Sequence, residues 1–147
     1  MNVSKSEYAK MVKKASPPSK IFTNCLKAFL VGGIISVIGE LLSKLYGELG
    51  LGLNQVAMLV PVTLIFLSIL LTAIGVYDII ARQAGAGTLV PITGFANAVA
   101  SPAIEFKTEG FVMGVGANMF KIAGPVIVFG TVASVIYGVI YWIGMIL

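Results

Sequence analysis

Residues 49–77 read LGLGLNQVAMLVPVTLIFLSILLTAIGVY and contain no charged side chain. A helix needs about 20 mostly apolar residues to cross the hydrocarbon core of a bilayer, and this run is longer than that. It therefore predicts a transmembrane helix, which we place at residues 56–80. Pro61 is tolerated because it falls in the opening turns, where few backbone hydrogen bonds are lost.

Three further uncharged runs flank this one, at residues 28–39, 83–104 and 122–147. The last is long enough to span a bilayer, and the first becomes so if Glu40 and Lys44 lie near a membrane face. We therefore expect an all-α integral membrane protein with three to four membrane-embedded segments. The expected segments are residues 21–46, 56–80, 84–109 and 110–147.

The overall composition excludes a soluble globular protein. Of the 147 residues, 58% are hydrophobic and 11% are charged, and the mean hydropathy is +1.00. Soluble domains are nearer half apolar and a quarter charged. One aqueous core cannot hide this excess of apolar side chains, so lipid must cover part of it. By length the chain forms one compact unit, a single transmembrane domain over residues 21–147.

The net positive charge lies before the first span. Residues 1–20 hold five lysines and one acid, which gives +4, whereas five bases and five acids cancel over residues 21–147. The positive-inside bias of membrane proteins then places the N-terminus in the cytoplasm. A short basic arm on an apolar chain is typical of contact with anionic lipid or an acidic partner, and we expect no nucleic acid partner.

The basic arm, residues 1–20, carries helix signals. Ser4 and Glu7 fit a capping box, and apolar residues follow at helical spacing with lysines opposite them. This pattern predicts a short amphipathic helix over residues 4–15, lying on the membrane surface. Pro17 and Pro18 should end it.

Residues 84–109 differ in composition from the uninterrupted apolar spans. Glycines and prolines interrupt the run at Gly85, Gly87, Pro91, Gly94 and Pro102. Irregular backbone at membrane depth is tolerated only where protein buries it or where it lines a watery cavity. We therefore expect a re-entrant or broken helical element here.

Small residues mark candidate faces for helix packing in the last segment. Small residues four positions apart let two helices approach closely. The residues with this spacing are Gly110 and Gly114, and then Gly130, Ser134 and Gly138.

The sequence lacks the residues that common enzyme sites need. There is no histidine, one cysteine and one aspartate, so a His-based triad and a Cys/His zinc site are excluded. No G-x-x-x-x-G-K-[ST] phosphate loop is present. We expect no enzyme activity, no cofactor and no bound metal.

Ionisable residues beside the membrane remain as candidates for function. Glu40 with Lys44, and Asp78 with Arg82, form acid-to-base pairs one helical turn apart. Each pair either lets a span end cheaply near the headgroups or takes part in a pore or a subunit contact.

A second group of polar positions clusters in and after the irregular element. Glu105 and Glu109 form either a solvated turn or part of a cation site or gate. Lys121 either contacts a solute or extends to the membrane surface. The full set of pore or solute-contact candidates is Gly94, Asn97, Glu105, Glu109, Asn118 and Lys121.

Several stretches resemble a known family in order along the chain. They are NCLKAFLVGG at residues 24–33, GAG at 85–87, VPITGFAN at 90–97 and EGF at 109–111, followed by NMFK at 118–121. Together they resemble the stage V sporulation protein AC/AE family, the SpoVA membrane proteins. The resemblance covers roughly residues 20–146, and the basic arm is more similar to the AC type.

The resemblance implies a place in the inner membrane of the forespore and spore. Members of the family act with other SpoVA membrane and peripheral subunits to move dipicolinic acid, with calcium, during sporulation and germination. Channel behaviour that responds to membrane tension is also attributed to the family. The family offers no set of catalytic residues to transfer to this chain.

Helix dimensions imply that one copy does not make a pore. Helices about 10 Å across pack solidly in threes and fours, so we expect a homo- or hetero-oligomer. The alternative is a non-conducting scaffold that assembles partner SpoVA subunits or couples them to germination receptors.

Overall fold

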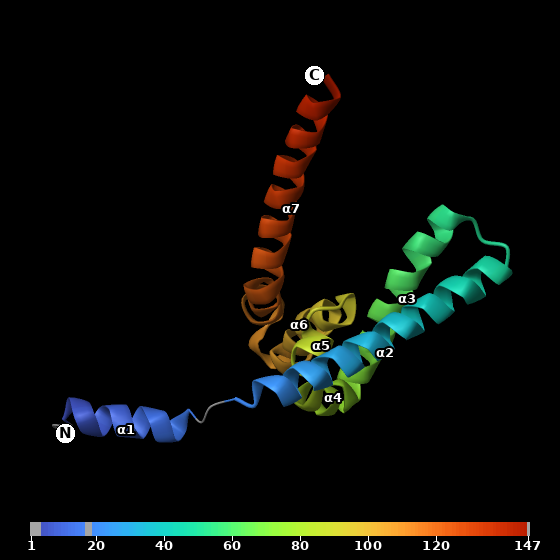
Figure 1. The fold of residues 1–147 in the computed structure, drawn as a ribbon. Helices are drawn as coiled ribbons and strands as arrows, with labels where there is room; N and C mark the ends of the chain where they lie inside the picture. The colour runs from blue at the N-terminus through green and yellow to red at the C-terminus, as the bar shows by residue number, and fades with distance from the viewer. Residues whose placement is uncertain (1–3, 17–18, 147) are drawn as a thin grey trace.

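The structure is a computed structural model that describes residues 4–16 and 19–146, and within these every regular element is helical (Figure 1). Three of the described helical stretches, α2, α3 and the stretch Phe111–Ile146, are long and apolar enough to cross a membrane. In chain order the elements are α1 (Lys5–Ala15), α2 (Ile21–Glu48), α3 (Leu53–Ala73), α4 (Val76–Ala84), α5 (Ala86–Leu89), α6 (Ile92–Glu105), the 3-10 turn η1 (Lys107–Glu109), the π-helical turn η2 (Phe111–Gly116) and α7 (Ala117–Ile146). The expectation of an all-α fold is confirmed.

Helix α1 begins with the capping box that the sequence predicts. The Ser4 hydroxyl accepts the Glu7 N–H at 3.3 Å, and the Glu7 carboxylate accepts the Ser4 N–H at 3.1 Å. Figure 1 shows α1 extending away from the other helices. The predicted break at Pro17 and Pro18 lies outside the described residues, and contact of α1 with a membrane surface stays a prediction.

Helices α2 and α3 form an antiparallel hairpin (Figure 1). The Gln55 side chain accepts the Gly52 N–H at 3.0 Å and thereby caps the start of α3. Near the turn, the Tyr46 and Thr63 hydroxyls hydrogen-bond across the hairpin at 2.7 Å. This bond joins one polar side chain from each helix, so it also fixes their register.

The second span is shorter than the predicted residues 56–80. Helix α3 runs from Leu53 to Ala73, and α4 starts as a separate helix at Val76. Gly75 between them has φ +75°, and its N–H bonds to the Thr72 carbonyl at 3.0 Å. A left-handed glycine ends a helix because the chain can turn there at no steric cost. Because the residues on both sides of Gly75 are apolar, the sequence gives no clear signal that a helix ends there.

The irregular stretch 84–109 forms two helices with a break between them. Helix α5 ends at Leu89, and Pro91, whose ring nitrogen carries no N–H, precedes α6. Helix α5 packs on α2, while α6 packs on α3 and on the start of α7. The short helices α4 to α6 therefore lie against the α2–α3 hairpin, as Figure 1 shows. Whether this element crosses or re-enters a bilayer stays a prediction.

The contact between α5 and α2 is backbone on backbone. A Cβ atom placed on Gly87 would lie 2.9 Å from the Ala28 Cα atom and would also collide with the Ala28 carbonyl oxygen. On the facing side, a Cβ atom on Gly32 would lie 3.5 Å from the Gly87 carbonyl oxygen. Only a glycine at position 87 lets the two backbones approach this closely.

Helix α7 stands apart from the remaining helices. Gly110, with φ +94°, and the turn η2 redirect the chain after α6. Helix α7 packs on α6 and η2 near its start and then extends away from the bundle (Figure 1). All of residues 125–146 are exposed in the isolated chain. An apolar helix of this kind must be covered by lipid or by other subunits.

The close approach at Gly87 leads to a test with a matched control. We expect Gly87→Ala to lower the free energy of unfolding by about 1–3 kcal/mol, because the added methyl group forces α5 off α2. Gly33→Ala meets open space and should leave stability unchanged or raise it by up to about 1 kcal/mol. Unfolding by SDS in mild-detergent micelles measures both values. Equal effects of the two substitutions would contradict the backbone contact.

Candidate functional site

Four polar residues join α3 to α6 along one line, which we call the polar seam: Ser68, Thr72, Thr93 and Asn97. The Ser68 hydroxyl donates to the Thr93 carbonyl oxygen at 2.6 Å, and the Thr72 hydroxyl shares its one proton between the Ser68 carbonyl oxygen at 2.7 Å and Asn97 Oδ1 at 2.8 Å. Both helices advance by four residues between the two bonds that join them, so α6 runs parallel to α3 here. Ser68 is 1% exposed and Asn97 is half-buried.

One hydroxyl of the polar seam has no partner. Thr93 is 7% exposed, and its Oγ1 atom makes no hydrogen bond within the described residues. A buried polar group left unpaired costs about 1–3 kcal/mol of desolvation free energy. The seam thus combines satisfied hydrogen bonds, which fix α6 in place, with one group that destabilises the packed state.

A tyrosine of α4 hydrogen-bonds to the backbone beside the break between α5 and α6. Tyr77 is 5% exposed, and its hydroxyl donates to the Thr88 carbonyl oxygen at 2.9 Å. The Thr88 hydroxyl in turn donates to the Gly85 carbonyl oxygen at 3.1 Å. The Tyr77 bond anchors the end of α5 to α4. The Thr88 hydroxyl adds a local bond to the Gly85 oxygen, which also accepts the Thr88 and Leu89 N–H groups.

A cavity of about 290 Å³ lies between the α2–α3 hairpin and the short helices. Its walls are mostly Ile, Leu and Val side chains of α2 and α3, with Tyr77, Thr88 and Thr93 at the side of the short helices. A wall of this composition suits an apolar occupant and gives no favourable path for a dicarboxylate ion.

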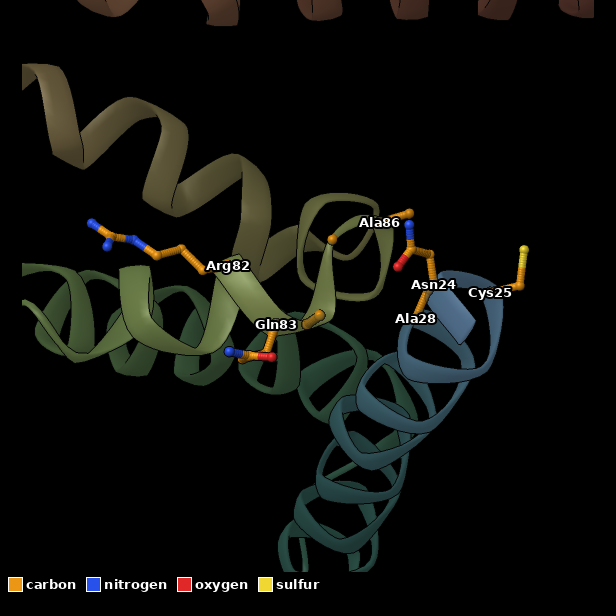
Figure 2. A pocket seen from close by; sticks show the side chains of 8 residues that line it. Asn24, Cys25, Ala28, Arg82, Gln83 and Ala86 are labelled. Carbon is orange, nitrogen blue, oxygen red and sulfur yellow. The ribbon is translucent and has the colours of Figure 1, made fainter. Parts of the chain in front are cut away.

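A second cavity, the α2–α4 pocket, lies between the start of α2 and the end of α4 (Figure 2). It has a volume of about 350 Å³. The Lys27 ammonium group donates to Gln83 Oε1 at 3.3 Å and so ties the two helices together beside the pocket. The lining residues are Asn24, Cys25, Ala28, Arg82, Gln83, Ala84, Gly85 and Ala86.

The two predicted charge pairs form on the surface. Arg82 bonds to Asp78 at 2.7 Å, and Lys44 lies 3.8 Å from Glu40. All four side chains are more than half exposed, so each pair contributes little to stability. Figure 2 shows the Arg82 side chain directed away from Asn24, toward the outside of the α2–α4 pocket.

Two of the predicted solute-contact residues meet at the start of α7. Lys121 donates to Asn118 Oδ1 at 2.6 Å, and Asn118 donates to the Gly114 carbonyl oxygen at 2.8 Å. Asn118 is 8% exposed. Within the isolated chain, Asn118 therefore stabilises the turn before α7 and holds the Lys121 side chain.

The other predicted solute-contact residues are dispersed. Asn97 belongs to the polar seam, and Gly94 packs closely against the Thr88 and Leu89 carbonyl oxygens. Glu105 and Glu109 are exposed at the end of α6 and in η1. The structure thus does not gather these candidates into one site within a single chain.

The small residues of the last segment fall into two different settings. Gly110 and Gly114 lie in the turn before α7 and not on one α-helical face, because Gly110 precedes the π-helical turn η2 and Gly114 belongs to it. Gly114 is closely packed, since a Cβ atom on it would lie 2.8 Å from the Phe106 carbonyl oxygen. Gly130, Ser134 and Gly138 lie exposed along α7. A helix contact through this α7 face stays a prediction.

Sequence reasoning predicted Asn97 but missed the other three residues of the polar seam and the buried role of Tyr77. Ser68 and Thr72 are four residues apart inside the uncharged run 49–77, which places both hydroxyls on one face of an apolar helix. This spacing is the sequence signal from which a polar contact on that face could be predicted. Tyr77 ends the uncharged run 49–77, and the structure shows that it is buried and binds a backbone oxygen.

The chemistry of the polar seam is hydrogen bonding without acid or base. It contains three hydroxyls and one amide, and these groups can orient backbone or a polar solute but do not transfer protons readily. Among residues 4–16 and 19–146, no group of three or more His, Cys, Asp and Glu side chains is placed to hold a metal ion.

Apolar helices whose polar side chains bond to one another and to backbone at helix breaks are the architecture of a polytopic membrane protein. Residues 24–140 match the model of the SpoVAC/SpoVAEB sporulation membrane protein family. The chain is 50% identical over 138 residues to stage V sporulation protein AC of Bacillus subtilis (strain 168). The aligned region covers 92% of this chain and 91% of that protein. No solved structure matches the chain.

The chain therefore belongs to the SpoVAC/SpoVAEB family of sporulation membrane proteins. The family resemblance predicted from the sequence is confirmed, and so is the fold class of an all-α integral membrane protein.

The polar seam leads to a test with two equal substitutions. Thr72→Val removes the hydroxyl that bonds to Asn97 and to the Ser68 carbonyl oxygen, and it should lower the free energy of unfolding by about 0.6–1.7 kcal/mol, the range for hydrogen bonds between membrane helices. Thr93→Val removes a hydroxyl without a partner and should leave stability unchanged or raise it. SDS titration in mild-detergent micelles measures both. A loss for Thr93→Val as large as that for Thr72→Val would contradict the bonding described for the seam.

Proposed function

We propose that the chain is a subunit of a channel that moves dipicolinic acid, with calcium, across the inner membrane of the forespore and spore. The observation that carries the proposal is the broken helix pair α5–α6, in which the polar seam holds α6 on α3. The chain that contains this pair is a member of a sporulation membrane protein family. Broken helices with polar contacts inside an apolar bundle are typical of transport proteins.

In this proposal the conducting path forms between subunits. Helix α3 contacts both α2 and α6 directly, with Ser68 and Thr93 hydrogen-bonded at 2.6 Å, and the cavity beside these helices is apolar. A hydrated dianion requires a wider, polar path. Exposed Glu105, Glu109 and Lys121 would reach such a path only in an assembly with other SpoVA subunits or further copies.

The chain acts as a passive component in this proposal, with no catalytic site of its own. The sequence carries no phosphate loop and no histidine, so transport would follow the solute gradient, membrane tension or partner proteins. The excess of lysine in residues 1–20 supports a cytoplasmic N-terminus.

The isolation of α7 supports a second candidate function. Residues 125–146 are exposed in the single chain, and Gly130, Ser134 and Gly138 give α7 a narrow face on which another helix can pack. A non-conducting scaffold would use this face to assemble the SpoVA subunits or to couple them to germination receptors.

Flux from vesicles tests the channel proposal. Vesicles that contain the purified chain are loaded with calcium dipicolinate and a neutral solute of similar size, and release is followed with and without an osmotic downshift. We expect dipicolinate to leave faster than the neutral solute, with the purified chain alone or after partner SpoVA subunits are added. Retention in the presence of all partners would overturn the proposal.

Two variants separate the channel from the scaffold in the same assay. In a Cys25→Ser background, Glu105→Cys should react with a water-soluble thiol reagent and change the flux, whereas Phe129→Cys serves as the control on the apolar surface of α7, which is exposed in the single chain. In the scaffold case Gly138→Leu would disrupt the assembly, and labelling of Glu105→Cys would leave the flux unchanged.

A further inference from the structure

The α2–α4 pocket lies where the apolar part of the bundle begins. The uncharged run 28–39 follows Lys27 along α2, and Arg82 lies three residues before the break at Gly85 that ends α4. The lysine-rich residues 1–20 immediately precede α2. Charged groups at the edge of apolar helices mark the level of the lipid headgroups. The pocket thus opens at a membrane–water interface.

The polar groups of the pocket are suited to an oxyanion. Asn24 and Gln83 line it from opposite helices, and their amides can donate hydrogen bonds (Figure 2). Lys27 lies beside it, with its ammonium group 3.3 Å from the neutral Gln83 Oε1 atom. Asp78, the acid on α4, is bonded to Arg82 at 2.7 Å. The positive charge of Lys27 is therefore available to a ligand.

Exposed apolar side chains also lie on α2 and α4, outside the lining of the pocket. Phe22 is 84% exposed and Leu26 is 50% exposed on α2, and Ile79 is 66% exposed on α4. A ligand with a charged head and apolar chains would satisfy both surfaces at once. A volume of about 350 Å³ is at the small end of ligand pockets, about 300–1,000 Å³. It can hold a headgroup but not a whole lipid.

We propose that the α2–α4 pocket binds the phosphate headgroup of an anionic phospholipid. Lys27 supplies the charge, Asn24 and Gln83 supply hydrogen bonds, and the acyl chains run along the exposed apolar side chains of α2 and α4. Basic sites between membrane helices on the cytoplasmic side are typical of lipid headgroup recognition. The bound lipid would bridge α2 and α4 whether or not the chain conducts.

Cys25 provides a native reporter for this site. It is the single cysteine of the chain, it is exposed, and it lines the pocket. The full chain is placed in phosphatidylcholine vesicles with rising fractions of phosphatidylglycerol, and the rate of Cys25 alkylation by an uncharged maleimide is measured. We expect the rate to fall as the headgroup of phosphatidylglycerol fills the pocket.

Two lysine variants on the same helix give a matched comparison. Lys27→Gln should raise the phosphatidylglycerol fraction needed for half-protection about fivefold, the factor expected for the loss of one lysine near an anionic surface. Lys44→Gln removes the same charge at the opposite end of α2 and should leave the fraction unchanged. Because Lys27 lies only two residues from Cys25, the rate in pure phosphatidylcholine serves as the baseline for each variant. Equal shifts, or no protection in the unmodified chain, would overturn the proposal.

A third variant and a soluble anion complete the test. Gln83→Glu keeps a partner for Lys27 and adds a negative charge to the pocket, so it should abolish protection while the fold is kept. Inorganic phosphate is added to pure phosphatidylcholine vesicles as the soluble competitor. Protection of Cys25 by phosphate alone, at concentrations that match the lipid effect, would assign the pocket to a free oxyanion and overturn the lipid proposal.

Discussion

The rest of this structure depends on one constraint, the need to satisfy backbone carbonyl groups where a helix breaks inside an apolar bundle. Helix α5 is only four residues long, and Pro91 after it supplies no N–H. An unsatisfied carbonyl in an apolar environment costs several kcal/mol. The Tyr77 hydroxyl binds the Thr88 oxygen near the end of α5, where the helix breaks, and the Ser68 hydroxyl is an additional donor to the Thr93 oxygen in the first turn of α6. These side chains determine where the broken element lies on α3 and α4.

The same constraint divides the chain into a closed part and an open part. Within the α2–α6 bundle, side-chain hydrogen bonds and the Gly87 contact hold the helices together. Helix α7 contributes an apolar surface that the described chain does not cover, and the acids at the end of α6 are exposed. The α2–α6 bundle is thus suited to form one wall of a solute path, or to bind a partner subunit, but it does not enclose a solute path by itself. This division explains why both the channel proposal and its scaffold alternative require an assembly.

The sequence predicts the helices better than it predicts their contacts. Long uncharged runs and the Ser4–Glu7 box are local signals, and they place α1, α2, α3 and α7 to within several residues. Proline and glycine density predicts a broken element at 84–109, but the stop at Gly75 is concealed by apolar residues on both sides. The partners of Ser68 and Tyr77 lie 25 and 11 residues away along the chain. Such pairings depend on how the helices pack, and helical spacing alone does not specify that.

The measurement that tests the central claim most directly is amide hydrogen exchange in Tyr77→Phe. The substitution keeps the ring and removes the hydroxyl that binds the Thr88 oxygen. In lipid nanodiscs we expect exchange in residues 86–97 to rise roughly fivefold or more, the effect of losing at least about 1 kcal/mol locally. Exchange in residues 53–60 of α3 should not change. Unchanged exchange in residues 86–97, or an equal rise in both segments, would contradict the account.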